Sequence, residues 1–152
     1  MDDALSDEQI NLLVMQFLRQ HFTRLHTLMD QIGLFRGQPP VLHQLWENEG
    51  INQTELAERL HLAPATVTKM VQRMELAGLI ERRADPADQR ITRVYLTAAG
   101  RDVQDAVRQR ERQIGEEALA GFSQAEKSQL AGFLGRMRDN LLIQNSRETH
   151  EC

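Results

Sequence analysis

Residues 53–96 read QTELAERLHLAPATVTKMVQRMELAGLIERRADPADQRITRVYL, and this stretch decides the fold. Asn52 and Glu55 form a helix-start signal, and the helix that follows has room for barely two turns. Residues 61–63 are too few for anything but a tight turn. A proline then opens a second helix, expected over 64–77, with a glycine as its stop. Two short helices joined by three residues are a helix-turn-helix.

Two runs of strand-forming residues come next, at 79–84 and 91–96. They flank residues 85–90, DPADQR, in which aspartate followed by proline favours a turn. Two strands with a charged tip directly after a helix-turn-helix make a β-hairpin wing, which we expect over 79–97. The predicted fold class is therefore mainly α with a small β-hairpin (α+β), a winged helix-turn-helix over 38–100.

Long helices are expected before this region. Residues 6–9, SDEQ, have the form of a capping box, and apolar residues then recur at helical spacing up to Gly33. About 27 residues at ~1.5 Å each make this first helix about 40 Å long, which is longer than a lone domain of this size needs. Part of the helix is therefore expected to pack against another chain. Pro39 and Pro40 open a second helix that ends at Gly50.

Long helices are also expected after the wing. Thr97 is expected to cap one long helix with an apolar stripe that runs to Ala118. Residues 123–126, SQAE, form a capping box for a last helix with a broad apolar stripe, and residues 146–152 are predicted to be a frayed tail. This stripe consists of Leu130, Phe133, Leu134, Met137, Leu141 and Leu142. We expect a single domain over 1–152.

The composition excludes several classes of protein. The 152 residues are 41% hydrophobic and 26% charged, and no apolar run approaches the ~18 residues of a membrane span. The acidic N-terminus is unlike a signal peptide, so we expect a cytoplasmic protein without a membrane partner. The only cysteine is Cys152 and the five histidines lack metal-site spacing, so we expect no metal and no cofactor. No nucleophile elbow, phosphate loop or dinucleotide fingerprint is present, which argues against an enzyme.

The net charge of −4 is unevenly spread along the chain. Residues 53–101 carry 8 basic and 6 acidic side chains, whereas the segments before and after are net acidic. Only this middle third is therefore suited to approach phosphates.

The helix expected over 64–77 has two different faces. Val67, Met70, Val71 and Met74 recur at the spacing of a core face. The opposite face carries Ala65, Thr68, Lys69 and Gln72. A hydroxyl, a cation and an amide are the side-chain types that read base edges and hold phosphates in a major groove. The alternative is an ordinary solvated face.

The tip of the wing is rich in charge of both signs. It sets four arginines against two aspartates, namely Arg82, Arg83, Arg90 and Arg93 against Asp85 and Asp88. This pairing predicts a stiffened tip. Our hypothesis is that Asp88 orients Arg90 for insertion into the minor groove, whose negative potential favours a guanidinium. The alternative is a solvated hairpin with incidental ion pairs worth under ~1 kcal/mol.

Taken in order, these residues resemble the MarR (multiple antibiotic resistance regulator) family of bacterial winged-helix transcription factors, over nearly the whole chain. The matching motifs are 53–57 (QTELA), 66–68 (TVT), 74–82 (MExxGLIxR), 85–90 (DxxDxR) and 96–100 (LTxxG). His61 stands at a turn position where glycine is common in the family, and histidine tolerates a left-handed backbone better than most residues.

The resemblance implies an obligate homodimer that binds double-stranded DNA at a near-palindromic operator. The dimerisation helices would be residues 1–36 and 101–145, and the two winged regions would meet successive major-groove faces. By family habit, repression is expected rather than activation. The DNA contacts inferred from the helix, the wing and the resemblance are Thr54, Ala65, Thr66, Thr68, Lys69, Gln72, Arg73, Arg82, Asp88, Arg90 and Arg93.

Many members of this family release DNA when a small anionic aromatic compound binds between the dimer helices and the winged domain. The resemblance therefore implies a phenolic or aromatic acid as ligand. The side chains expected to line such a cleft are His21, Arg24, His26, His43 and Trp46. The alternative is that they are ordinary packing and surface residues of long helices. Peroxide-sensing members use a cysteine near the start of the first helix, and this chain has none there.

A winged helix can also dock protein partners without binding DNA, and this is the main alternative function. A docking face should show exposed apolar anchors, whereas the outward face of the 64–77 helix offers polar groups and one cation. The sequence therefore favours a sequence-specific DNA-binding transcription regulator.

Overall fold

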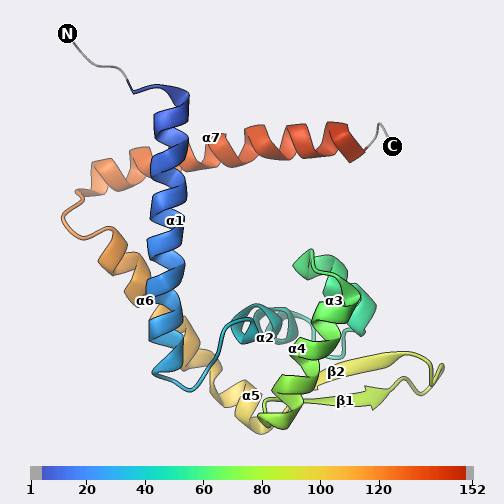
Figure 1. Cartoon of the computed structure of the whole chain (residues 1–152). Coiled ribbons are helices and arrows are strands. Elements are labelled where there is room, and N and C mark those ends of the chain that lie inside the picture. The colour runs from blue at the N-terminus through green and yellow to red at the C-terminus, as the bar shows by residue number, and fades with distance from the viewer. Residues whose placement is uncertain (1–4, 150–152) are drawn as a thin grey trace. The chain divides into compact units, whose positions relative to one another are not determined.

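A computed structural model describes residues 5–149 of the chain, with side chains through Asn145. The elements in chain order (Figure 1) are α1 (Asp7–Asp30), α2 (Gln38–Glu47), α3 (Gln53–Leu60), α4 (Pro64–Leu76), β1 (Ile80–Ala84), β2 (Thr92–Leu96), α5 (Ala98–Asp102), α6 (Gln104–Ala118) and α7 (Gln124–Thr149). The predicted fold class, mainly α with one small hairpin, is confirmed. The chain divides into two compact units, Met1–Ile114 and Gly115–Cys152, and each is described by itself.

The helix starts follow local signals in the sequence. Ser6 and Gln9 form the predicted capping box, because the Gln9 N–H donates to Ser6 Oγ (3.2 Å) and the Ser6 N–H donates to Gln9 Oε1 (2.8 Å). Asn52 caps α3 through its side-chain oxygen, and Ser123 and Glu126 exchange the same pair of bonds at the start of α7. These contacts satisfy N–H groups that have no partner inside the helix, so each start is encoded within three residues.

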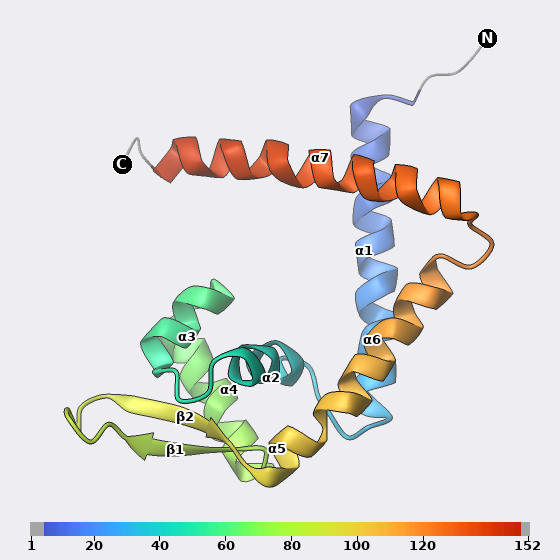
Figure 2. The ribbon, with the colours of Figure 1, turned by 180° about the vertical axis from the view of Figure 1, so that it is seen from behind.

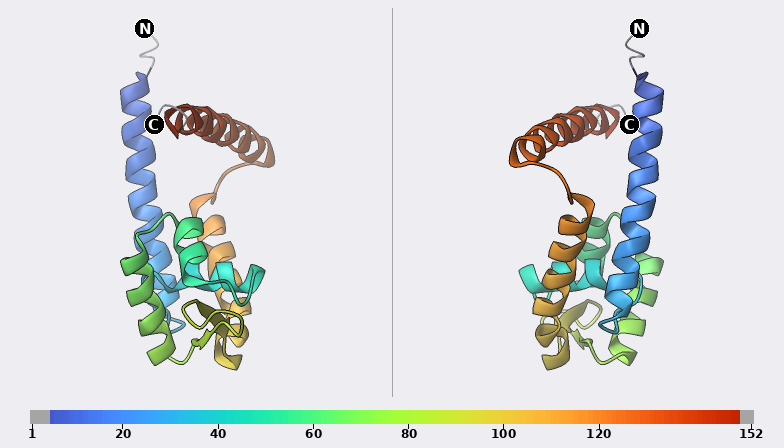
Figure 3. Two further views of the ribbon diagram at one scale, coloured as in Figure 1. Left: turned by 90° about the vertical axis from the view of Figure 1, so that its right-hand side faces the viewer. Right: turned by 90° about the vertical axis from the view of Figure 1, so that its left-hand side faces the viewer.

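The core of the first unit lies between α2, α3, α4 and the hairpin. In Figures 2 and 3, α2 lies between α4 and the first turns of α6, while β1 packs on α4 and β2 packs on α2. The side chains in this core that are at most 1% exposed are Leu34, Val41, Leu42, Leu45, Leu56, Val67, Val71, Met74, Ile80, Val94 and, from α6, Val107. Burial of each such side chain contributes about 1.5–3 kcal/mol, so the shared core holds α4 and the wing in a fixed relation.

The wing is a two-stranded antiparallel sheet, in which β1 and β2 pair from Ile80↔Leu96 onwards. The segment before α3 extends this sheet. The Gly50 N–H donates to the Val94 carbonyl at 2.9 Å, and the Val94 N–H donates to the Ile51 carbonyl at 3.0 Å. The base of the wing is therefore bonded on its outer edge to the α2–α3 connection.

Two elements differ from the sequence predictions. The single helix expected after Thr97 is interrupted at Val103, which is half-buried against the core and has a ψ of −10°. That tightened backbone ends α5 before α6 begins. The frayed tail expected from residue 146 is also wrong for the described part of it, because the helical backbone of α7 continues to Thr149. Residues 150–152 lie outside the described residues.

Within residues 5–149, no helix is long and apolar enough to span a bilayer. No group of three or more His, Cys, Asp or Glu side chains in that range is arranged to hold a metal ion.

Candidate nucleic-acid interface

The helix α4 is fixed at both ends by local backbone geometry. His61 ends α3 in the left-handed conformation (φ 52°, ψ 42°), which makes the tight turn that the sequence predicts. Pro64 is the first residue of α4, as expected. At the other end Gly78 has a φ of 74°, and the N–H groups of Gly78 and the next residue donate back into the last turn. The helix therefore ends at Leu76, one residue earlier than predicted.

The two faces of α4 are separated as the sequence predicts. Val67, Val71 and Met74 are 0% exposed, and Met70 packs half-buried against the same core. The exposed side chains on the outward face are Ala65, Thr66, Lys69, Gln72, Arg73 and, at the end of the helix, Leu76, which is 90% exposed. A well-packed inner face makes α4 a rigid support for these outward side chains.

The polar side chains on this face differ in whether they form hydrogen bonds within the chain. Thr68 is half-buried, and its hydroxyl donates to the Pro64 carbonyl at 2.9 Å. Lys69, Gln72 and Arg73 have no side-chain hydrogen bond or ion pair to any residue that the structure describes. Their donors are therefore available to a ligand outside the chain.

The tip of the wing is organised by Asp85, which is only 7% exposed. Its carboxylate accepts the N–H groups of Ala87 (2.7 Å) and Asp88 (3.2 Å) and pairs with Arg93 from β2. Arg93 donates in turn to the Gly50 carbonyl at 2.9 Å. The tip is stiffened as the sequence predicts, with Asp85 as the residue that does it.

Asp88 contacts Arg90 through the backbone, and its role in orienting Arg90 for the minor groove stays a prediction. Asp88 Oδ1 accepts the backbone N–H of Arg90 at 3.0 Å, because a short aspartate side chain reaches the amide two residues on more readily than a distant guanidinium. The Arg90 guanidinium is exposed and has no hydrogen-bond or ion-pair partner among residues 5–145. Asp88 shapes the turn and leaves the Arg90 guanidinium free.

The other arginines of the wing are engaged within the protein. Arg82 donates to both oxygens of Glu75 on α4, through its Nε (2.9 Å) and its backbone N–H (3.0 Å), and these bonds lower the pKa of Glu75. Arg83 pairs with a glutamate on its own strand, and Arg93 is held by Asp85. Among the four wing arginines, all within the described part of the chain, only Arg90 presents an unpaired guanidinium.

Thr54 and Arg90 border one open groove of about 400 Å³ between the start of α3 and the wing tip. Thr54 lies exposed in the first turn of α3, where the backbone N–H groups point out of the helix. Two predicted DNA contacts that lie far apart in sequence are therefore brought together, while the outward residues of α4 form a separate surface.

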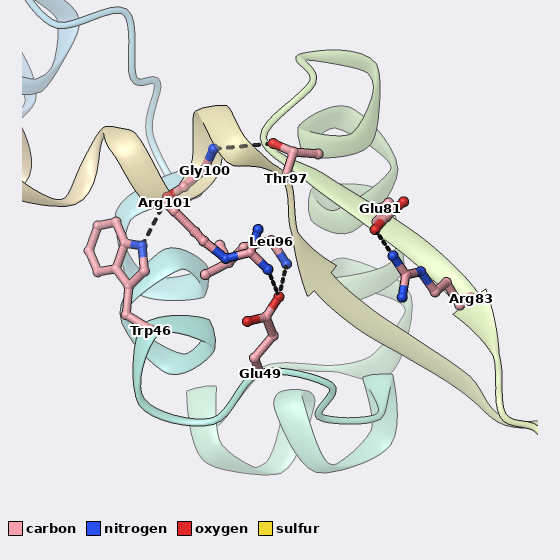
Figure 4. A network of polar contacts seen from close by, with 8 residues as sticks. All are labelled: Trp46, Glu49, Glu81, Arg83, Leu96, Thr97, Gly100 and Arg101. Carbon is pink, nitrogen blue, oxygen red and sulfur yellow. Dashed lines mark hydrogen bonds and ion pairs between the residues drawn. The ribbon is translucent and has the colours of Figure 1, made fainter.

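The base of the wing is tied to α2 by side-chain hydrogen bonds (Figure 4). Trp46 Nε1 donates to the Gly100 carbonyl of α5 at 2.9 Å. Glu49 Oε1 accepts the Leu96 N–H at 3.1 Å and also pairs with Arg101. These contacts join residues 47 to 54 positions apart in the chain. They join α2 and Glu49, two residues after its end, to β2 and α5.

A cavity of about 320 Å³ lies between α1, α2, α6 and the segment 35–40. Its apolar walls include Leu25, Met29, Phe35, Pro39 and Pro40. His26 and His43, two of the five side chains expected in a ligand cleft, line it together with Glu111. The expected cleft residues that do not line it are His21, Arg24 and Trp46. Trp46 instead uses its indole N–H in the contact with α5.

Known proteins are similar to this chain in sequence and in fold. The sequence model described as MarR family matches residues 36–92. The uncharacterized HTH-type transcriptional regulator YybA of Bacillus subtilis is 31% identical over 110 residues, which are 72% of this chain and 73% of that protein. The crystal structure of the transcriptional regulator SlyA has a TM-score of 0.73 and 31% identity, and the alignment covers 90% of this chain and 94% of that one. The chain belongs to the MarR family.

A third relative is the transcriptional regulator HosA of Escherichia coli O127:H6, 35% identical over 113 residues, which are 74% of this chain and 82% of that protein. MarR-family proteins are DNA-binding transcription regulators that form dimers, and they are not enzymes. The matched segment 36–92 contains α2, α3, α4 and the wing through its tip. The family therefore favours DNA binding over the protein-docking alternative.

The sequence analysis missed two charged residues of this MarR-type fold, Glu49 and Glu111, and named a third, Asp85, without its backbone contacts. Asp85 had a signal, because aspartate before proline at a hairpin tip is typical of a side chain that bonds the next backbone amides. Glu49 and Glu111 have no such signal in the sequence, because their partners lie 47 or more residues away in the chain. Only packing reveals them.

The nearly buried carboxylate of Asp85 gives a test of the wing tip. Arg93, followed by the N–H groups of Ala87 and Asp88, lowers the pKa of Asp85 below its ordinary value of 3.8. Because the pKa is lower in the folded chain, ionised Asp85 stabilises the fold above that ordinary value, and this contribution is lost as the pH falls through the folded pKa. Asp85→Asn should lower the melting temperature at pH 7 by roughly 2–6 °C and flatten its fall on acidification.

Thermal unfolding followed by circular dichroism between neutral and acid pH measures both effects at one protein concentration. Asp88→Asn is the matched control, because Asp88 accepts a single backbone bond from Arg90. Equal shifts in the two variants would contradict the role assigned to Asp85.

Proposed function

We propose that this chain is a cytoplasmic repressor that binds a near-palindromic operator as a homodimer and releases it when a small aromatic ligand binds. The outward face of α4 carries this proposal. Lys69, Gln72 and Arg73 stand exposed, without partners in the described part of the chain, on a helix whose inner face packs into the core. A rigid helix with available cationic and amide donors is what readout of a major groove requires.

Each residue of the α4 face has a proposed role in that groove. The Gln72 amide suits an adenine edge, and the Lys69 ammonium suits the two acceptors of guanine. Ala65 offers a methyl group to a thymine methyl, while Thr66 and Arg73 hold flanking phosphates. The hydroxyl of Thr68 already donates its hydrogen to the Pro64 carbonyl within the helix, so we propose that it accepts a hydrogen bond from a base amino group.

The wing and α3 are proposed to hold the backbone beside that groove. Thr54 contacts a phosphate, and Arg90 enters the adjacent minor groove. Arg82 and Arg93 support the wing through Glu75 and Asp85 instead of reaching the DNA themselves. Of the wing residues expected from the sequence to contact DNA, only Arg90 is therefore proposed to do so, because its guanidinium is unpaired within the described residues.

A second copy of the chain is proposed to cover the apolar faces of α1 and α7. Ile10, Leu13 and Phe17 in the first turns of α1 are between 41% and 53% exposed. The exposed large apolar side chains of α7 are Phe133, Leu134, Met137, Leu141, Leu142 and Ile143. Soluble monomers rarely leave contiguous apolar patches of this kind in water. Residues 1–36 and 101–145 are therefore the proposed dimerisation segments, and two-fold symmetry places one winged region on each operator half-site.

The ligand half of the proposal rests on the cavity beside α2. A volume of about 320 Å³ lies within the range of small-molecule sites. His43 faces this cavity, and one turn later Trp46 bonds to the carbonyl of Gly100 at the base of the wing. A ligand that shifts α2 would therefore shift the wing against α4 and weaken its fit to DNA.

Salt dependence of DNA binding tests the first half of this proposal. Genomic fragments retained by the purified protein supply an operator duplex, and fluorescence anisotropy at several salt concentrations gives its affinity. If the dimer makes about six or more phosphate contacts, log K should fall with log salt with a slope of about −5 or steeper. The operator should bind at least about 10³-fold more tightly than random duplex of equal length.

An affinity that does not change with salt would argue against phosphate contacts. Equal affinity for operator and random duplex would exclude sequence-specific regulation. A monomer that holds a single half-site as tightly as the dimer holds the full operator would contradict the dimeric arrangement.

A further inference from the structure

One permanently charged side chain, that of Glu111, lines the cavity beside α2. Glu111 brings a carboxylate, His26 and His43 bring imidazoles, and no lysine or arginine is among the described residues that line it. An imidazole is positive only when protonated, so the single fixed charge facing the cavity is negative.

Glu111 and His43 are already paired across the cavity wall. His43 Nε2 lies 2.5 Å from Glu111 Oε1, and since an ionised carboxylate can only accept, the imidazole N–H is the donor. The second carboxylate oxygen of Glu111, Oε2, has no partner among the described residues. About a third of each side chain is exposed, which leaves the pair open to an incoming ligand.

These contacts set the kind of polar group that the cavity accepts. Where both imidazoles are neutral, a ligand carboxylate would meet the negative charge of Glu111 with no cation in the cavity lining to offset it. A ligand N–H or O–H can donate to the free oxygen, and a ligand cation adds a charge-assisted bond. The aromatic part of the ligand would lie against the apolar walls around Leu25 and Phe35.

We infer that this cavity binds a planar aromatic molecule that ends in a positive charge or a hydrogen-bond donor, such as an aryl amidine, aryl amine or phenol, and that it discriminates against aromatic carboxylates. The inference deepens the proposed function and rests on its assumption that the cavity is the effector site. The family resemblance implies a phenolic or aromatic acid; the inference retains the phenol and replaces the acid group with a hydrogen-bond donor or a positive charge.

Three probes of nearly identical shape test this inference. Benzamidinium, benzamide and benzoate differ in charge by one unit at each step. Trp46 is the only tryptophan of the chain, and its ring centroid lies 5.1 Å from that of His43, so its fluorescence reports occupancy of the cavity. At pH 8, where imidazoles are ordinarily neutral, benzamidinium should bind most tightly and benzoate about tenfold or more weakly.

The matched variants are Glu111→Gln and Asp105→Asn, two charge removals on α6, of which only the first faces the cavity. Glu111→Gln should weaken the binding of benzamidinium about fivefold or more and should reduce the ratio of its affinity to that of benzoate. Asp105→Asn should change neither quantity. Melting curves show whether the variants are folded, and the ranking in the unmodified chain tests the inference without any variant.

Tightest binding of benzoate by the unmodified chain, or an affinity ratio of benzamidinium to benzoate that does not change in folded Glu111→Gln, would overturn the inference and leave the proposed ligand response standing. If none of the three probes changes either Trp46 fluorescence or operator binding at millimolar concentration, the ligand half of the proposed function fails, and the inference fails with it.

Discussion

Arg90→Ala is expected to weaken operator binding by the dimer about 100-fold, while Arg82→Ala should change it less than about threefold. The two arginines lie on the same wing and differ in what holds them. Arg82 donates to both oxygens of Glu75, whereas the Arg90 guanidinium has no partner in the described residues. Loss of one groove contact costs about tenfold in affinity for each half-site, and the dimer carries two copies.

Anisotropy titrations of both variants at several salt concentrations measure this difference. The salt slope should flatten by about two for Arg90→Ala, one ion for each copy, and should not change for Arg82→Ala. Arg82→Ala should instead lower the melting temperature slightly, because Glu75 on α4 loses the guanidinium and keeps only the backbone N–H of residue 82. Wild-type affinity in Arg90→Ala, or equal losses in the two variants, would remove the proposed minor-groove contact.

Gly100→Ala is expected to destabilise the protein by about 2–4 kcal/mol, which lowers the melting temperature of a chain of this size by roughly 6–12 °C. A Cβ on Gly100 would lie 2.1 Å from the carbonyl oxygen of Leu79 and 3.1 Å from Leu96 Cδ2. That carbonyl is backbone and accepts the Thr97 N–H at 3.1 Å, so it cannot simply rotate away. The displacement of α5 would also pull the Gly100 carbonyl from Trp46.

Gly115→Ala is the matched control for this prediction. Gly115 is also a helical glycine, and a Cβ there meets nothing within 4 Å. Alanine in a helix interior is favoured over glycine by about 0.8–1.0 kcal/mol, so this variant should melt at or above the temperature of the unmodified chain. Scanning calorimetry at one protein concentration compares the two, because melting of a dimer depends on concentration. A Gly100→Ala variant as stable as the control would mean that the wing base tolerates a shift of α5.

The features predicted correctly from sequence are those encoded over three or four residues. The capping boxes at Ser6 and Ser123, the proline start of α4 and the glycine stop after it each depend on neighbours along the chain. The buried stripe of α4 follows from helical spacing alone. The break at Val103 was not predicted, because the apolar pattern of the sequence continues through it as in a helix. The interruption appears where Val103 packs against the core.

The sequence by itself therefore determined the winged helix-turn-helix and which face of α4 looks outward, because periodicity and capping act locally. Only the tertiary structure decided which arginine of the wing has an unpaired guanidinium within the described residues. Four arginines and two aspartates on one hairpin allow several pairings, and the choice depends on Glu75 from α4 and on the Gly50 carbonyl before α3. The same holds for Glu111, whose approach to His43 from 68 residues away gives the cavity its negative charge. Partners so distant in the chain meet only when the core closes.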